Sequence, residues 1–209
     1  MPGFPEHFTT ARLAVARLTL VDTGFVRAMD LDARITALSG GIRSEEQTLD
    51  YMRAALAHWD RHGFGVLLLR DRKDGRPVGR AVLRWAEIEG ATELELGYGF
   101  LPERWGQGLG TEITAALVDL AAARLDHSSI VALTDRENRA SRRVLEKAGF
   151  AYERDADHRG GLFPLYRRPL TSVRAVLPPG RDTGLTTDSA SPVGQEDTHN
   201  QNAVPRTRL

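Results

Sequence analysis

The sequence predicts one α/β domain of the α+β type, in which a mostly antiparallel central sheet is flanked by helices. Three observations predict it. Strand-like runs separated by polar turns fill residues 64–101, and apolar residues recur at helical spacing on either side of them. The chain has 209 residues, of which 41% are hydrophobic. This length and composition suffice for one well-buried domain but hardly for two.

Charge and composition exclude several classes of protein. Lys plus Arg and Asp plus Glu number 28 each, so no global basic field attracts nucleic acid. The absence of cysteine excludes disulfides and thiol nucleophiles, and it fits a reducing compartment. No apolar run approaches the ~18 residues of a membrane span, and the N-terminus lacks the features of a signal peptide. We therefore expect a soluble, cytoplasmic protein that binds neither nucleic acid nor membrane.

The chain begins with an expected arm, residues 1–9, ahead of a domain that spans 10–176. Arg12 to Leu18 alternates weakly, which indicates an edge strand. Asp22 can cap a first helix, whose apolar positions are Phe25, Val26, Met29 and Leu31.

Ser44 to Gln47 forms a capping box that opens a second helix, through about His62. His58 and His62 lie four residues apart on that helix and could in principle hold a metal. No third ligand is evident nearby, so we expect a solvated helix face and no metal.

Three strands follow, with turn residues between them. They are Phe64 to Arg70, Pro77 to Trp85 and Ala91 to Phe100, separated by a hairpin loop with Gly75 and a charged turn over Ala86 to Gly90. This spacing predicts an antiparallel meander.

The third of these strands leads into a glycine-rich turn. Gly97 and Gly99 interrupt the strand, and glycine there usually marks a bulge or the close approach of another group. Gly106, Gly108 and Gly110 lie at the start of a helix that runs through Arg124. The N–H groups in the first turn of a helix have no intrahelical partner and attract phosphate. Thr111 and Glu112 follow Gly110, so the Lys-Ser/Thr of a P-loop is missing, and the spacing does not fit the dinucleotide fingerprint. A glycine-rich corner without a ligand is the alternative.

The remaining chain predicts a short strand, a helix and a closing strand. These are Ile130 to Leu133, Glu137 to Ala148 with Gly149 as its C′ residue, and Leu162 to Arg168 after a polar loop over Asp155 to Gly161. From residue 177 to 209, Pro, Gly, Ser, Thr, Asp, Asn and Gln dominate, which predicts a disordered tail.

Two motifs carry a resemblance to a known family. A strand followed by Pro-Glu-x-Trp-Gly-Gln-Gly-Leu-Gly-Thr-Glu from Pro102, and the run from Glu137 to Phe150, resemble the GNAT N-acetyltransferase superfamily. More narrowly, they are similar to the branch of ribosomal-protein N-terminal (alanine) acetyltransferases. The resemblance implies a GNAT-like sheet that is splayed at the acyl-CoA site. It also implies acetyl-CoA as co-substrate and a primary amine as acceptor. We expect direct attack in a ternary complex, and a monomer or homodimer.

The resemblance also implies the residues that hold the cofactor. Main-chain groups near Phe100 and Leu101 would bond the pantetheine, and N–H groups of Gln107 to Thr111 the pyrophosphate. Asn138 and Ser141 would meet the cofactor or its thiol, or simply cap their helix. Trp105 replaces a polar residue common in the family, for which Arg104 or Arg143 could compensate. The implied cofactor residues are Phe100, Leu101, Arg104, Trp105, Gly106, Gln107, Gly108, Leu109, Gly110, Thr111, Asn138 and Ser141.

Amine acetylation needs a base for the ammonium and a proton for the departing thiolate. Glu95 and Glu93 are the candidate bases, because they lie two residues apart on one strand face and could raise each other's pKa. A solvent-facing strand face, or a water chain as base, is the alternative. Leu145 stands where many family members carry a tyrosine acid, which leaves Ser141, a water or direct release of the thiolate. We favour Ser141, because a serine hydroxyl can donate a hydrogen bond to sulfur.

Two other functions remain open from the sequence. One is a non-catalytic, regulatory acyl-CoA-binding module, which would need neither glutamate. The other is an antibiotic-modifying acetyltransferase, in which an acidic acceptor site would be made by Glu87, Glu89, Glu93 and Asp155.

Overall fold

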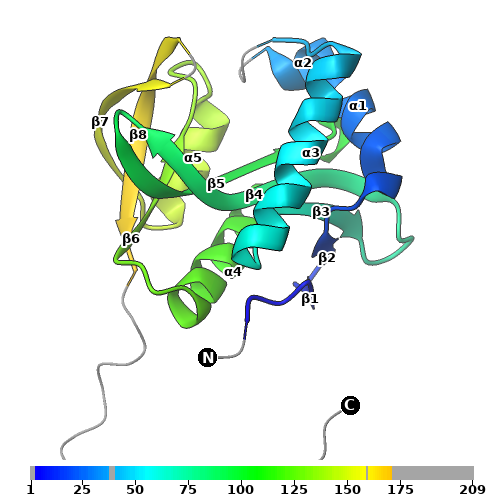
Figure 1. The fold of residues 1–209 in the computed structure, drawn as a ribbon, viewed down its shortest axis with the longest axis horizontal. Coiled ribbons are helices and arrows are strands. Elements are labelled where there is room, and N and C mark those ends of the chain that lie inside the picture. The colour runs from blue at the N-terminus through cyan, green and yellow to red at the C-terminus, as the bar shows by residue number, and fades with distance from the viewer. Residues whose placement is uncertain (1–2, 38–40, 159, 171–209) are drawn as a thin grey trace, which may run out of the picture. The chain divides into compact units, whose positions relative to one another are not determined.

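The computed structural model describes residues 3–37, 41–158 and 160–170, and in that part of the chain an eight-stranded sheet forms the centre of the fold (Figure 1). Its strands are β1 (His7–Thr9), β2 (Leu13–Arg17), β3 (Val66–Asp71), β4 (Pro77–Ile88), β5 (Ala91–Phe100), β6 (Ser129–Leu133), β7 (Ala151–His158) and β8 (Gly161–Pro169). The helices are α1 (Thr23–Leu31), α2 (Ala33–Thr36), α3 (Glu45–His62), α4 (Leu109–Arg124) and α5 (Arg139–Lys147), with short 3-10 turns η1 (Leu20–Asp22) and η2 (Pro102–Arg104). The tail predicted for 177–209 lies outside the described residues.

The strand order is β1-β2-β3-β4-β5-β6-β8-β7. Neighbouring strands are antiparallel except β5 and β6, which are parallel. This confirms the predicted mixed, mostly antiparallel sheet flanked by helices, and the predicted meander is β3-β4-β5.

The N-terminal residues join the sheet instead of preceding it. His7–Thr9 pairs with β2, and Phe4 is buried in the core. The strand predicted over Arg12 to Leu18 is therefore present but is not an edge. A three-residue strand is too short to give a periodic signal, which explains why its pairing was missed.

The predicted polar loop over Asp155 to Gly161 was wrong. Residues through His158 belong to β7, which pairs with β8 along its length. Most side chains of β7 are exposed or half-buried. The strand therefore lacks the alternation of apolar and polar residues that is typical of a strand with one buried face. The charged turn before β5 is likewise shorter than predicted, because β4 runs to Ile88 and only Glu89 and Gly90 turn, both with positive φ.

The side-chain cap predicted from the sequence is present in α3 but not in α1. Ser44 and Gln47 form the predicted capping box of α3. Asp22 precedes α1, but its carboxylate makes no cap bond there. It accepts instead from Thr19 and Arg70.

The two faces of β5 are covered by different helices. Val82 pairs with Gly97 and packs against a cluster that includes Val26 of α1 and Met52 of α3. Alternation along the strand places Glu93 and Glu95 on this same face. Leu96 points the other way and shares a core cluster with Ile113 of α4. Glu93 and Glu95 therefore lie on one face of β5, and α4, the helix that follows the glycine turn, covers the other face.

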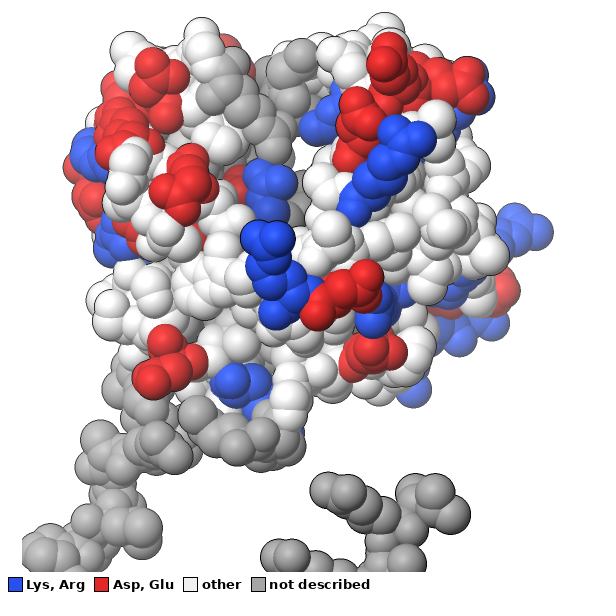
Figure 2. All heavy atoms as spheres, viewed as in Figure 1, with Lys and Arg blue, Asp and Glu red and all other residues white. Residues whose placement is uncertain are grey.

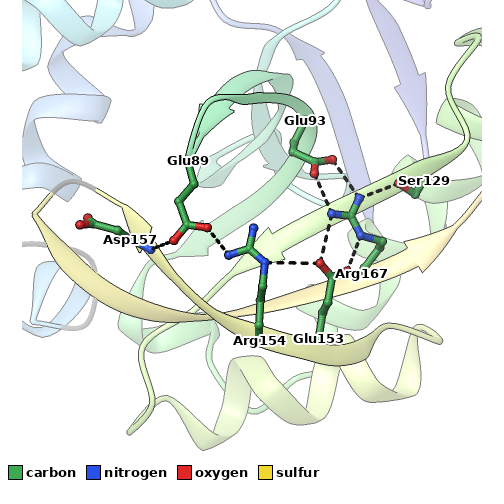
Figure 3. A network of polar contacts seen from close by, with 7 residues as sticks. All are labelled: Glu89, Glu93, Ser129, Glu153, Arg154, Asp157 and Arg167. Atoms are coloured by element: carbon green, nitrogen blue, oxygen red, sulfur yellow. Dashed lines mark hydrogen bonds and ion pairs between the residues drawn. The ribbon is translucent and has the colours of Figure 1, made fainter.

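A polar network holds the tip of the β4–β5 hairpin against β7 and β8 (Figure 3). Arg167 of β8 donates to both carboxylate oxygens of Glu93, at 2.7 and 2.9 Å. Arg154 of β7 pairs with Glu89, which also accepts the N–H of Asp157 at 2.8 Å. The network ties together strands that are distant in sequence.

Candidate functional site

The sheet opens between β5 and β6. In the described residues, Glu95 opposite Val131 is the one register pair that joins these strands, although β5 continues beside β4 to Phe100. Beyond that pair, the inner edge of β5 has no strand partner and would suit a ligand that completes it. The predicted splay between these strands is confirmed.

Main-chain groups of β5 point into this opening at alternate residues. Leu101 donates its N–H to the carbonyl of Val78 on β4, at 2.9 Å. Because ladder bonds alternate along an antiparallel pair, the groups of Phe100 and Tyr98 point away from β4 and toward the opening. The carbonyl of Phe100 accepts the indole N–H of Trp105 at 2.8 Å. The Leu101 N–H, predicted to be free, is thus used inside the sheet, and the groups of Tyr98 were missed.

The glycine turn leads into α4 with unpaired N–H groups. The first helical bond joins the Glu112 N–H to the carbonyl of Gly108, at 3.2 Å. None of the N–H groups of residues 107–111 has an acceptor within the described part of the chain. Gly108 is the N-cap residue and has φ +77°, a conformation that favours glycine. The turn therefore presents convergent donors at the positive end of the helix dipole, as an anion site requires.

Arg12 holds this turn in place from the N-terminal part of the chain. Its guanidinium donates to the carbonyl of Gln107 at 2.6 Å and to the carboxylate of Glu112 at 2.7 Å. Burial would raise the pKa of Glu112, but hydrogen bonds from Thr10 and Arg12 lower it overall. The ion pair neutralises a carboxylate that would otherwise repel an anion from the first turn of α4. Sequence reasoning missed Arg12, which lies 95 residues before Gln107.

Gly110 leaves room for the ring of Tyr98. A Cβ at this position would lie 2.9 Å from the ring of Tyr98, closer than side chains tolerate. Burial raises the pKa of the Tyr98 hydroxyl, and the nearby Ser141 side chain partly offsets this by lowering it. Two hydroxyls thus meet beside the first turn of α4. The sequence analysis named Ser141 but treated Tyr98 as an ordinary strand residue, although the missing side chain at Gly110 was the available signal.

Other predicted cofactor residues have partners within the protein. The Asn138 side chain accepts the Ser141 N–H at 3.0 Å, so Asn138 is the N-cap of α5. Arg104 pairs with Asp71 at 2.8 Å. The side chain of Trp105 is 50% exposed, beside the glycine turn.

Glu93 and Glu95 each have an arginine partner. Glu93 is held by Arg167, whose hydrogen bonds lower the pKa of Glu93. Glu95 accepts from Arg84 at 2.7 Å. The predicted rise in the pKa of Glu93 was therefore wrong, because a cation and not the other glutamate dominates its surroundings. Arg167 occupies both carboxylate oxygens of Glu93, whereas Arg84 contacts only Oε2 of Glu95. Glu95 therefore stays the candidate base, and Glu93 belongs to the hairpin network.

The acidic residues considered for a cationic acceptor are also engaged. Each accepts a hydrogen bond or forms an ion pair: Glu87 with Thr92, Glu89 with Arg154, Glu93 with Arg167, and Asp155 with Arg136. They do not form a free acidic cluster, which is what the antibiotic-modifying hypothesis needs.

The α1/α3 face of β5 is open above Gly97. A Cβ there would contact only Val82, at 3.9 Å, whereas a Cβ at Gly99 would lie 3.5 Å from Met29 of α1. Figure 2 shows this face of the molecule hollowed between the side formed by β7 and β8 and the side formed by α1 and α3, with Lys or Arg atoms at the lower end. Glu95 and its partner Arg84 lie on the same face.

A buried charge cluster holds α1 and α3 against the sheet beside this hollow. Asp30 is fully buried and accepts from Arg80 at 2.6 Å, from Arg43 at 3.0 Å and from Thr48 at 3.1 Å. Both guanidinium groups also lie over the ring of Tyr51, 4.9 and 5.0 Å from its centre. The cluster links α1, α3 and β4, and nothing in the sequence pattern distinguished Asp30 from nearby surface acids.

His58 is a structural residue. Its Nδ1 contacts the carbonyl of Phe64 at 2.7 Å, and its Nε2 accepts the Trp85 N–H at 3.0 Å. Both ring nitrogens are used, so His58 is not available as a metal ligand. This arrangement needs the neutral ring, and burial lowers the pKa of His58.

We expect His58 to make the fold less stable in mild acid. Its folded pKa lies below the unfolded value of 6.5, so the unfolded chain binds the proton first. The contribution is complete above that value and is lost as the pH falls below it toward the folded pKa. Urea unfolding of the wild type and of His58→Gln from about pH 5 to about pH 8 measures this. Equal pH slopes in the two proteins would contradict the assignment.

Two kinds of feature are absent from the described residues. No helix there is long and apolar enough to cross a bilayer. No group of three or more His, Cys, Asp or Glu side chains is arranged to hold a metal ion in that part of the chain.

Comparisons with known proteins agree with this geometry. The uncharacterised protein YkkB of Bacillus subtilis (strain 168) is 27% identical over 123 residues, 59% of this chain and 72% of YkkB. An acetyltransferase from Agrobacterium tumefaciens (str. C58) superposes with a TM-score of 0.70 and 24% identity, over 80% of this chain and 96% of its own. The ribosomal-protein-S5-alanine acetyltransferase of Vibrio fischeri superposes with a TM-score of 0.64 and 16% identity, over 78% of this chain and 96% of the Vibrio chain. These likenesses show a shared fold.

The family assignment rests on a longer match. The family described as "Acetyltransferase (GNAT) domain" matches residues 12–151, which include the splay, the glycine turn and α5. The chain belongs to the GNAT acetyltransferase family.

Proposed function

We propose that this chain is an acetyl-CoA-dependent N-acetyltransferase that modifies a primary amine in a ternary complex. One observation carries the proposal: the sheet opens next to a turn of unpaired N–H groups, and the two faces of the opened strand carry different chemistry. Glu95 lies on the α1/α3 face, and the hydroxyls of Tyr98 and Ser141 lie on the α4 face.

The residues present fit acetyl-CoA. The N–H groups of Gln107 to Thr111 would hold the pyrophosphate, since they lack acceptors and lie at a helix N-terminus. The main-chain groups of Tyr98, and the N–H of Phe100, would hold the pantetheine along the unpaired edge of β5. When bound, acetyl-CoA supplies an activated acetyl thioester.

The protein's own groups would manage two protons. Glu95, fixed by Arg84, would take a proton from the acceptor ammonium, directly or through water, so that the neutral amine can attack. On the other face, the Ser141 hydroxyl would donate a hydrogen bond to the departing thiolate, and the thiolate would take its proton from the nitrogen that has attacked the thioester. Tyr98 retains its own proton, because burial raises its pKa, and its hydroxyl lies near the Ser141 side chain.

The acceptor is a protein N-terminus or a small-molecule amine. The structural neighbours include RimL, a ribosomal L7/L12 α-N-protein acetyltransferase in complex with coenzyme A, and a spermidine N-acetyltransferase from Vibrio cholerae in complex with CoA and spermine. The motifs that resemble the ribosomal-protein branch favour an N-terminus. We expect the enzyme to act in the cytoplasm, as a monomer or a homodimer.

Acetyl-CoA binding should depend on Gly108. A carboxylate introduced by Gly108→Asp would stand among the unpaired N–H groups and repel the pyrophosphate. Two like charges about 4 Å apart cost about 4 kcal/mol at an effective dielectric constant of about 20, so we expect affinity to fall at least about a hundredfold. Isothermal titration with acetyl-CoA measures it.

Gly75→Asp is the matched control, because it adds the same charge at another glycine of positive φ, +71°, where nothing lies within 4 Å. It should bind like the wild type. No binding by the wild type would contradict the proposed function, and equal binding by Gly108→Asp would show that the anion lies elsewhere.

A further inference from the structure

The floor of the hollow above Gly97 lies between two charged ends. Across the β4–β5 pair, this face carries three rows of residues: Arg84 with Glu95, Val82 with Gly97, and Arg80 with Gly99. The two glycines leave β5 without side chains between Glu95 and the row of Arg80. A ligand on this floor therefore meets a carboxylate at one end and a guanidinium at the other.

The guanidinium end carries more positive charge than the cluster neutralises. Arg80 and Arg43 both donate to Oδ1 of Asp30, at 2.6 and 3.0 Å. Both guanidinium groups also lie over one ring, that of Tyr51. Two cations thus share one anion, and their mutual repulsion favours a second anion beside them.

The same two arginines keep donors that no described group accepts. Nη1 of Arg80 is buried without a hydrogen-bond partner in the described part of the chain. Among the described residues, the Arg43 side chain donates through Nη1 alone, and 23% of that side chain is exposed. Arginine binds carboxylates through paired, charge-assisted hydrogen bonds, so a carboxylate of the acceptor suits this end of the floor.

The spacing of the two ends fits a peptide better than a free amino acid. In the proposed reaction the amine meets the thioester where the sheet opens, beside the pair of Glu95 and Val131. The row of Gly99 and Arg80 lies about 7 Å beyond the row of Gly97, since each strand residue advances about 3.4 Å. A free amino acid carries both charges on one carbon. An extended peptide advances about 3.3–3.6 Å per residue, so the side chain of its second or third residue can reach the arginines.

We infer that the acceptor is a peptide N-terminus with Asp or Glu at its second or third residue, which Arg43 and Arg80 bind while Glu95 takes the proton of the amine. The inference rests on the proposed function, because the amine must first lie between Glu95 and the thioester. A polyamine is disfavoured, since a second positive charge on the acceptor would lie beside these arginines.

The test first compares peptides in the wild type. Each peptide begins with alanine and is neutral elsewhere, except that its second, third or sixth residue is Glu, Gln or Lys. Thiol release at saturating acetyl-CoA gives kcat/KM. We expect Glu to exceed Gln about tenfold at the second or third residue, as a hydrogen bond between charged groups allows, and Lys to fall below Gln. At the sixth residue the three peptides should react alike.

Arg43→Gln then tests which residues read the acidic side chain. Asp30 keeps Arg80 as a partner in this variant, and the comparison within the wild type does not depend on it. The ratio of Glu to Gln should fall at least about threefold, while kcat/KM for the Gln peptide stays unchanged. Arg53→Gln is the matched control, because it removes an arginine that pairs with Asp50 in solvent, and it should keep the wild-type ratio.

Two results would overturn the inference and leave the proposed function intact. One is a wild type that shows no preference for Glu at either residue, or that acetylates spermidine faster than every peptide. The other is a ratio in Arg43→Gln as large as in the wild type. A wild type that neither binds acetyl-CoA nor releases thiol with any amine would overturn both the inference and the proposed function.

Discussion

Asp30→Ala is expected to lower the free energy of unfolding by about 3–5 kcal/mol, the range for removing one partner from a buried ion pair. The carboxylate is fully buried and accepts from Arg80 and Arg43 at 2.6 and 3.0 Å. Its removal leaves two guanidinium groups without their counter-ion. One guanidinium nitrogen of Arg80 is already buried and without a hydrogen-bond partner among the described residues, so little compensation is at hand. Urea unfolding measures the loss.

Asp50→Ala is the matched control for this experiment. Asp50 also pairs with an arginine, Arg53 at 2.8 Å, but the two side chains are 65% and 72% exposed. An exposed pair contributes at most about 1 kcal/mol, so this variant should stay within that range. A loss below about 1 kcal/mol in Asp30→Ala as well would mean that water replaces the carboxylate in the cluster.

Glu95→Gln is expected to reduce kcat about 100- to 10,000-fold at neutral pH, the range for removing a general base. The amide keeps the shape of the side chain but cannot accept the ammonium proton. The KM for acetyl-CoA should change little, because Glu95 lies on the face of β5 opposite α4. The loss should shrink as the pH rises, since more of the amine is then neutral without a base. Thiol release with a saturating amine measures kcat across pH.

Glu93→Gln separates this role from a general effect of charge. Glu93 lies on the same strand face, but Arg167 holds it in the hairpin network. We expect Glu93→Gln to be less stable than the wild type and to retain kcat. Equal kcat in wild type and Glu95→Gln would remove the proposed base. That outcome would favour a water chain as the base. A wild type that releases no thiol with any amine would instead favour the regulatory acyl-CoA-binding module.

Local chemistry accounts for what could be predicted. The capping box at Ser44, the meander around Gly75 and the strand-turn-helix through Gly108 lie within short stretches of chain, and the structure has each of them. The polar strand β7 was missed because its apolar partners are supplied by β8 and not by its own alternation. The short strand β1 was missed because only its pairing with β2 defines it.

The sequence by itself determined the β3-β4-β5 meander, the helix α3, the glycine turn ahead of α4, and the candidate side chains, because these depend on neighbours along the chain. Only the tertiary structure decided which candidates are free to act. It paired Glu93 with Arg167, Glu95 with Arg84 and Glu112 with Arg12, and it brought Tyr98 to Ser141. The physical reason is that a pKa, an ion pair or a packing contact is set by groups within a few ångströms in space, and those groups come from distant parts of the sequence.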